Sequence, residues 1–144
     1  MDDRGRAFHY ASFMLDYARQ RALEILKIPS RAVFVTSGPA GVHASMFPCE
    51  ASGLDLYILI PSASDHIFNL EHEHDVTLLT DVWELKGQAQ IMSPGRQNIE
   101  LDLLHEQGVE WCMLVRVEPS RLQIRNQKGW GYQETIDLTP SLQE

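Results

Sequence analysis

The order of strand-like and helix-like segments is the feature that most restricts the fold of this chain. Six or seven segments either alternate apolar and polar residues or form short β-branched runs, and only three have helical spacing. The helical segments fall before the first strand, between the third and fourth, and between the fifth and sixth. Because strands and helices do not alternate, a doubly wound parallel sheet is disfavoured. We expect a mainly β (α+β) fold, an antiparallel sheet or barrel with peripheral helices.

The bounds of the expected elements follow from local patterns. An amphipathic helix is expected over residues 8–27, because apolar residues recur at helical spacing until Pro29 stops it. A short helix begins near Asp65, and another is expected over residues 94–108, with Gly108 as its C-terminal stop. Strands are expected over residues 31–37, 42–48, 54–60, 75–81, 83–91, 109–119 and, as an edge strand, 131–138. We interpret residues 1–144 as one domain, with a barrel over about 31–125 and a C-terminal tail over 126–144.

Single residues within these strands carry further predictions. Gly87 interrupts an apolar face, which indicates a bulge or the close approach of another backbone. Trp111 is expected to face inward on its strand, and Pro119 with Ser120 is expected to turn the chain. Burial in the core or in an interface is expected for each of the three tryptophans, Trp83, Trp111 and Trp130.

Charge and cysteine content exclude several classes of protein. The net charge of −8 would repel nucleic acid and anionic membranes, and no basic patch offsets it. No segment approaches the roughly 20 apolar residues that span a bilayer, and the first ten residues lack the apolar core of a signal peptide. We therefore expect a cytoplasmic protein with no nucleic-acid or membrane partner. Cys49 and Cys112 have no CxxC partner and are expected as small buried or half-buried hydrophobes.

The stretch PSASDHIFNLEHEHD, residues 61–75, concentrates the ionisable side chains. His72 and His74 would point the same way in a strand and could bind a metal with neighbouring acids. At the end of a helix, however, residues two apart lie on different sides, and His66 is off the same face. A solvated helix end is the simpler interpretation. The chain also lacks the GxSxG, HExxH, Walker and GxGxxG motifs, so a hydrolase or nucleotide-binding site is not indicated.

A phosphate site is the other interpretation of this stretch. A strand runs into a turn and then into a helix, and the start of a helix offers free backbone N–H groups. Ser62 and Ser64 could bind an anion there or only cap the helix, and capping is the simpler reading. Asp65 stabilises the helix start but would repel a phosphate.

The order of the motifs resembles the FMN-binding split barrels of the pyridoxamine 5′-phosphate oxidase type. That family shows a serine that opens a short helix containing Asn-Leu, then an Asn-Pro strand, then a strand with a central Gly-x-Ala. The matching residues here are Ser64, Asn69-Leu70, Asp75-Val76-Thr77-Leu78 and Gly87-Gln88-Ala89. GVHASMFPCE is similar to the second strand of the family and RVEPSRLQI to its late strand, so the resemblance covers roughly residues 31–125.

The resemblance implies a homodimer with two FMN sites at the subunit interface, in a split barrel that acts as a small oxidoreductase. The flavin would carry the redox chemistry, and the protein would bind and enclose it. Ser64 would contact the phosphate at the helix start. The cofactor-binding residues implied are Ser62, Ser64, His66, Asn69, His43 and Ser45, whereas neither a catalytic residue nor a substrate is indicated.

The sequence departs from the family where the phosphate would bind. Asp65 and His66 replace an Arg-Lys pair, and His43 takes the place of a basic residue on the second strand. Each charge-assisted hydrogen bond lost costs about 1.5–3 kcal/mol, so losing two weakens phosphate binding by roughly two to four orders of magnitude. Two hypotheses follow: a flavin-dependent oxidoreductase, or a barrel that has lost flavin and binds another small ligand, such as haem, or acts as a regulator.

Overall fold

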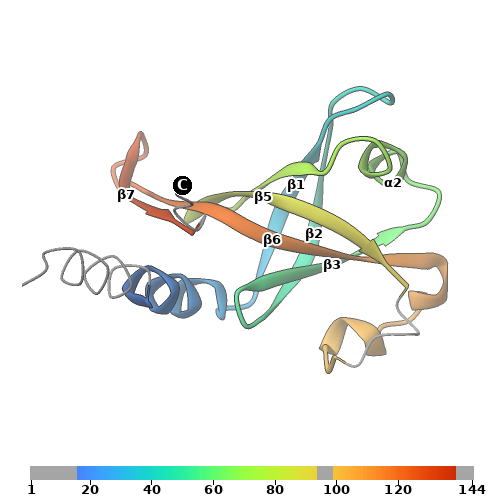
Figure 1. Ribbon diagram of the computed structural model, residues 1–144, viewed down its shortest axis with the longest axis horizontal. Helices are drawn as coiled ribbons and strands as arrows, with labels where there is room; N and C mark the ends of the chain where they lie inside the picture. The colour runs from blue at the N-terminus through green and yellow to red at the C-terminus, as the bar shows by residue number, and fades with distance from the viewer. Residues whose placement is uncertain (1–15, 94–98, 139–144) are drawn as a thin grey trace, which may run out of the picture.

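The structure, a computed structural model, describes residues 16–93 and 99–138, and its strands form one antiparallel sheet (Figure 1). The order in the sheet is β3-β2-β1-β4-β5-β6-β7, and β6 also pairs with β3, which closes the first six strands into a barrel. The antiparallel split barrel with peripheral helices is therefore confirmed. The strands are β1 (Ser30–Thr36), β2 (His43–Ser52), β3 (Asp55–Pro61), β4 (Asp75–Leu79), β5 (Trp83–Met92), β6 (Cys112–Arg125) and β7 (Tyr132–Asp137).

Strand β6 belongs to the barrel over only half of its length. Its residues 112–117 pair with β3, whereas its residues 121–125 pair with β7. Strand β5 pairs with both halves of β6. The barrel therefore opens where β6 leaves β3, and β7 continues the sheet as the edge strand that the sequence predicted.

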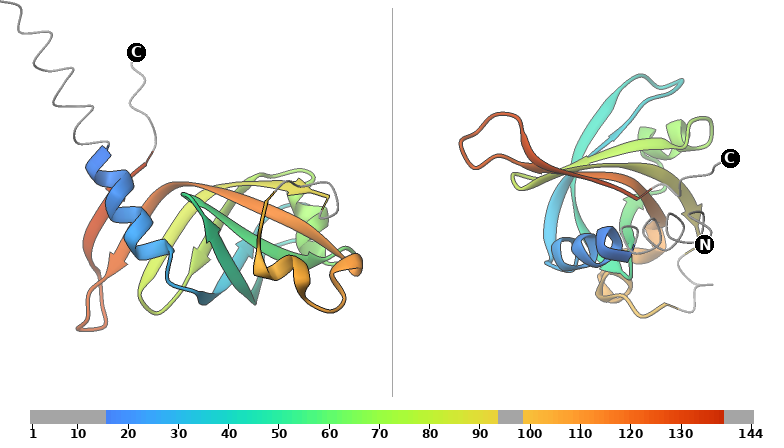
Figure 2. Two further views of the ribbon diagram at one scale, coloured as in Figure 1. Left: turned by 90° about the horizontal axis from the view of Figure 1, so that it is seen from below. Right: turned by 60° about the vertical axis from the view of Figure 1, so that its left-hand side comes forward.

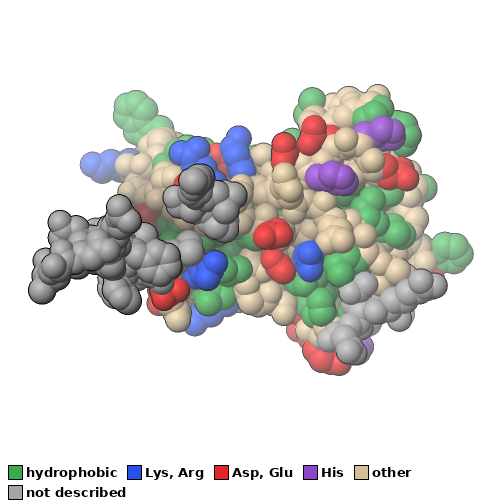
Figure 3. Space-filling view, viewed as in Figure 1, with side chains coloured by type: hydrophobic (Ala, Val, Ile, Leu, Met, Phe, Trp, Pro, Cys, Tyr) green, Lys and Arg blue, Asp and Glu red, His purple; other side chains and the backbone are tan. Residues whose placement is uncertain are grey.

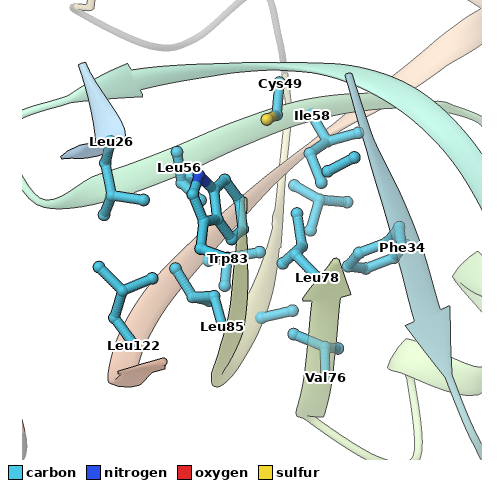
Figure 4. Close-up of a cluster of buried hydrophobic side chains, with 14 of the residues drawn as sticks. Leu26, Phe34, Cys49, Leu56, Ile58, Val76, Leu78, Trp83, Leu85 and Leu122 are labelled. Atoms are coloured by element: carbon cyan, nitrogen blue, oxygen red, sulfur yellow. The ribbon is translucent and has the colours of Figure 1, made fainter. Parts of the chain in front are cut away.

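The core fills the interior of the barrel with the inward residues of these strands. Trp83 is 4% exposed and lies among leucines from several strands, including Leu56 and Leu122 (Figure 4). A helix described over residues 16–26 covers this cluster with Ala22 and Leu26 and lies beside β7 (Figure 2). Arg21 of this helix donates to Glu134 of β7 at 3.1 Å. The helix was expected from residue 8, and residues 8–15 lie outside the described ranges.

A bulge at Gly87 lets β6 continue past its proline. The register between β5 and β6 shifts between Lys86 and Gly87, and a Cβ at Gly87 would lie 2.4 Å from the carbonyl oxygen of Glu118. The prediction for Gly87 is confirmed. The turn expected at Pro119 and Ser120 is wrong, because a proline at a bulge need not donate to the ladder and the strand runs on to Arg125.

The helix expected over residues 94–108 is also wrong for the part that is described. Residues 99–108 contain only the 3₁₀ turn η2 (Asp102–His105), and η3 (Val109–Trp111) follows it. The carboxylate of Glu50 on β2 accepts hydrogen bonds from the backbone N–H groups of Asp102 and Leu103 at 2.9 and 3.0 Å. Leu101 and Leu103 are buried against Tyr57 and Leu114. Contacts with distant strands thus set the path of this segment, and its helical spacing does not.

The three tryptophans have different environments in this chain. Trp83 lies in the core as expected, but Trp111 ends η3 and is 74% exposed, so its predicted inward position is wrong. Strand β6 starts three residues later than expected, at Cys112, so Trp111 precedes the strand. Trp130 is 82% exposed. Cys49 is buried and Cys112 half-buried, as expected. None of the helices within the described ranges has the length and apolar character needed to cross a membrane.

Candidate functional site

The candidate site lies where helix α2 (Asp65–Leu70) meets the hairpin of β1 and β2 (Figure 1). Ser64 is the N-cap, and its Oγ accepts a hydrogen bond from the backbone N–H of His66 at 3.1 Å. The backbone N–H of Ser64 donates to the carbonyl oxygen of Pro61 at 2.9 Å, which turns the chain from β3 into the helix. This is the capping role that the sequence favoured for Ser64.

His66 points into the barrel and is only 2% exposed. Its Nδ1 lies 2.8 Å from Oγ1 of Thr36 on β1, and its Nε2 lies 2.9 Å from Oγ of Ser45 on β2. The rings of Phe34 and Phe47 lie with their centroids 5.3 and 5.8 Å from that of His66. The imidazole is thus enclosed by aromatic rings, and both of its nitrogens are bonded to hydroxyl groups.

Asn69 is fully buried one turn further along α2 and holds the loop between β1 and β2. Its Nδ2 donates to Oγ1 of Thr36 at 3.2 Å and to the carbonyl oxygen of Gly41 at 2.8 Å. Its Oδ1 accepts from the backbone N–H of Ala40 at 2.9 Å. Gly38 has no room for a side chain, because a Cβ there would lie 2.8 Å from Oδ1 of Asn69.

Thr36, Ser45, His66 and Asn69 form one network, which we call the polar latch. Because Asn69 donates to Oγ1 of Thr36, the Thr36 hydroxyl can donate to Nδ1 of His66, and the Nε2–H of His66 then donates to Ser45. This arrangement satisfies every buried group with a neutral imidazole. Burial, and to a lesser extent the neighbouring His43, lowers the pKa of His66, while Asp65 opposes this effect. The latch therefore holds α2 on the hairpin with His66 uncharged at neutral pH.

The remaining predicted residues lie on the surface side of the latch. Nε2 of His43 donates to the carbonyl oxygen of Ala40 at 2.9 Å and lies 3.6 Å from a carboxylate oxygen of the exposed Asp65. Ser62 is exposed, and its backbone N–H donates to the carbonyl oxygen of Trp111 at 2.9 Å. Five of the six predicted residues thus lie together around the start of α2, and the side chain of Ser62 does not join them.

The histidines that follow α2 do not assemble into a cluster in the part of the chain that is described. His72 and His74 are both exposed, and Nδ1 of His72 donates to the carbonyl oxygen of Phe68 at 3.1 Å. Across residues 16–93 and 99–138, no three His, Cys, Asp or Glu side chains are placed to hold a metal ion.

The start of α2 does not fit a tightly held phosphate. His66 is buried with both nitrogens engaged, and Asp65 presents a carboxylate where the resemblance would place a cation. In Figure 3, histidine side chains gather over the α2 end of the visible face, whereas most Lys and Arg side chains lie toward the β6–β7 end. A phosphate at α2 would therefore meet hydroxyl and backbone groups without a charged partner.

Thr36 and Gly38 are the site residues that sequence reasoning missed. Thr36 occupies the third inward position of β1, after Ala32 and Phe34, and is 1% exposed. A polar residue at an inward position of a strand indicates a buried hydrogen-bond partner, and this signal was present in the sequence. Gly38 lies in a turn rich in glycine, where its specific contact could not be told from ordinary turn chemistry.

Comparisons with known proteins identify the fold. No protein-family profile and no curated protein matches the chain. A candidate pyridoxamine 5′-phosphate oxidase from Listeria innocua has 15% identity and a TM-score of 0.58, with 76% of this chain and 98% of that chain covered. A NimC/NimA family protein from Clostridium acetobutylicum has 16% identity and a TM-score of 0.61, with coverages of 90% and 98%. An F₄₂₀ reductase has 14% identity and a TM-score of 0.54, with coverages of 69% and 94%. At these identities the comparisons concern the fold alone.

Proposed function

We propose that this chain, which has the fold of the pyridoxamine 5′-phosphate oxidase-like split barrels, is a homodimeric small oxidoreductase that binds a flavin or deazaflavin. The observation that carries the proposal is the shared fold together with a formed helix start beside β2, at the positions where the resemblance implies the cofactor. In proteins of this kind the redox chemistry belongs to the cofactor. The residues of this chain are then needed to bind, to orient and to exclude water.

The outer face of the sheet supports the homodimer. Met46 of β2 lies beside Val33 of β1, which lies beside Leu79 of β4, and all three side chains point away from the core. Ala44 and Val35 form the next row on the same face. Met46 is 57% exposed. Soluble proteins rarely leave a contiguous apolar sheet face in water, and a second copy of the chain would cover it.

The phosphate end of the cofactor is where this protein differs from the pattern that it resembles. Because the start of α2 offers no cationic side chain, we expect the affinity for FMN to come from contacts with its ring and not from contacts with its phosphate. Riboflavin, which lacks the phosphate, is then expected to bind within about tenfold of FMN. A pair of charged anchors would instead favour FMN by roughly two to four orders of magnitude.

The experiment is a pair of fluorescence titrations of the purified chain with FMN and with riboflavin, preceded by a visible spectrum of the protein as isolated. A flavin absorption band, or quenching by either flavin at tens of micromolar, supports the proposal. No band and no quenching by either compound overturns the flavin assignment. A preference for FMN of a hundredfold or more overturns the account of the α2 site and leaves the flavin assignment standing.

A second candidate function is a barrel that no longer binds flavin and takes another small ligand. The observation that favours it is Asp65, an exposed carboxylate at the helix start. Asp65→Arg restores a cation there without entering the core, whereas a lysine at His66 would bury a charge. If a ring slot persists, Asp65→Arg is expected to raise the affinity for FMN at least tenfold while leaving that for riboflavin unchanged. If the wild-type chain binds neither flavin and Asp65→Arg does not gain affinity for FMN, the result supports the second function.

A further inference from the structure

A large hollow within the described residues lies far from α2, between the β4–β5 turn and the β6–β7 hairpin. Its volume is about 700 Å³. Strand β6 spans 14 residues, so its last residue, Arg125, lies roughly 40 Å from its first, which adjoins the α2 end. We call this hollow the hairpin pocket; its walls include Val82, Arg125, Asn126, Trp130 and Tyr132.

The β6–β7 hairpin presents Trp130 to solvent on an ordered turn. The backbone N–H of Asn126 donates to the carbonyl oxygen of Gly131 at 3.0 Å, and that of Gly129 donates to the carbonyl oxygen of Asn126 at the same distance. The side-chain oxygen of Asn126 also accepts from the backbone N–H of Lys128 at 2.9 Å. Gly129 and Gly131 flank the tryptophan with φ values of 94° and 74°. A fixed turn that exposes an indole is suited to bind a flat ring, because little conformational entropy is lost when the ring stacks.

Tyr132 supplies a second aromatic wall with a fixed orientation. Its hydroxyl donates to the carboxylate of Glu84 on β5, which anchors the ring against the sheet and raises the pKa of Tyr132. The phenol is therefore occupied at its polar end, and its ring remains an apolar surface at the pocket.

Arg125 brings a positive charge to the same pocket. Its Nε donates to the carbonyl oxygen of Thr80 at 2.9 Å, and its backbone N–H donates to that of Val82 at 2.8 Å. Within the described ranges no carboxylate lies at ion-pair distance from Arg125, so the outer edge of its guanidinium has no charged partner. The half-buried stem and the Nε bond hold the group in place, which favours the two-point binding of a carboxylate.

We propose that the hairpin pocket binds a small, flat aromatic monocarboxylate. Trp130 and Tyr132 take the ring, and Arg125 takes the carboxylate. Asp81 lines the same pocket, and Glu84 lies behind Tyr132, so a doubly charged phosphate is disfavoured against a single carboxylate. This inference does not depend on flavin binding, because the residues involved lie at the other end of β6 from the start of α2.

The test is isothermal titration calorimetry of the full chain with 2-naphthoate and with its neutral amide, 2-naphthamide. The acid is expected to bind at least tenfold more tightly than the amide. Trp130→Ala is expected to weaken binding of the acid at least fivefold through lost stacking. Arg125→Gln is expected to abolish the preference for the acid. Trp111→Ala is the matched control, because Trp111 is also largely exposed but lies at the opposite end of β6, and it is expected to change binding by less than twofold.

An NMR measurement keeps the proposal falsifiable if Arg125→Gln does not fold. The indole N–H signal of Trp130, identified by its loss in Trp130→Ala, is expected to shift on addition of 2-naphthoate, while that of Trp111 is expected to stay. Equal binding of acid and amide, a shift at Trp111 in place of Trp130, or no binding at millimolar naphthoate each overturns the proposal.

Discussion

Replacing Thr36 with valine tests whether the polar latch holds α2 in place. The substitution keeps the shape of the side chain and removes the hydroxyl that bonds both His66 and Asn69. Among the described residues Thr36 is the partner of Nδ1 of His66, so its loss leaves a buried nitrogen unsatisfied, which costs about 1–3 kcal/mol. Asn69 keeps its hydrogen bond to Gly41, and the loss of its hydrogen bond to Thr36 lowers the free energy of unfolding by about 1 kcal/mol. The added methyl group contributes about 0.8 kcal/mol in the opposite direction, so the net destabilisation is about 2 kcal/mol.

Urea unfolding followed by far-UV circular dichroism, at one protein concentration for all variants, measures this loss. With a slope of about 2 kcal/mol/M, Thr36→Val is expected to lower the midpoint by about 1 M at unchanged slope. Thr135→Val is the matched control: Thr135 is exposed on β7, away from the proposed dimer face, and its hydroxyl accepts a surface hydrogen bond from Gln123 at 3.4 Å. If the free energy of unfolding of Thr36→Val lies within 0.5 kcal/mol of that of Thr135→Val, the Thr36 hydroxyl does not bridge His66 and Asn69 and the latch is refuted.

Three further predictions concern the latch, the bulge and the dimer. Since the pKa of His66 is lowered in the folded state, the unfolded chain binds a proton at this residue at higher pH than the folded chain does. The free energy of unfolding is therefore expected to be at its full value above about pH 6.5 and to fall as the pH drops toward the lowered pKa. Urea midpoints compared across pH should show a smaller decrease in His66→Gln. Gly87→Ala places a methyl group against a β6 carbonyl and is expected to lower the free energy of unfolding by about 1–3 kcal/mol. Gln88→Ala, at the neighbouring exposed position, should change the free energy of unfolding by less than 0.5 kcal/mol in the same urea assay. Met46→Glu is expected to halve the mass in sedimentation velocity and Thr135→Glu on β7 to leave it unchanged; a wild-type chain that already sediments as a monomer would contradict the dimer.

Strand alternation and cap chemistry were enough to predict an antiparallel sheet or barrel and the position of α2, and the family resemblance narrowed this to the split barrel. The inward residues of β1 and β5 follow the two-residue period, and Ser64 caps the helix as its sequence context indicates. The predicted residues His66, Asn69 and Ser45 do meet in space. The local patterns were sufficient here because each element buries one face against the others.

Contacts between residues far apart in the chain explain what could not be predicted. Thr36 meets Asn69 across 33 residues, and Glu50 fixes the segment at Asp102 across 52. From the local sequence alone, Pro119 indicates the end of a strand. Strand β6 continues beyond Pro119 because Gly87 on the neighbouring strand has no side chain that would collide with the β6 backbone. No periodicity within one segment contains this information.

The double pairing of β6 has a consequence for how the chain folds as it is synthesised. Strands β1 to β5 leave the ribosome first, and until residues 112–125 follow, both β3 and β5 present unpaired edges. A single late strand then covers both edges, with Leu56 pairing to Val117 across a long stretch of sequence. Closure is therefore one event of high contact order, and the nascent chain passes through a stage in which two open edges could pair with other chains.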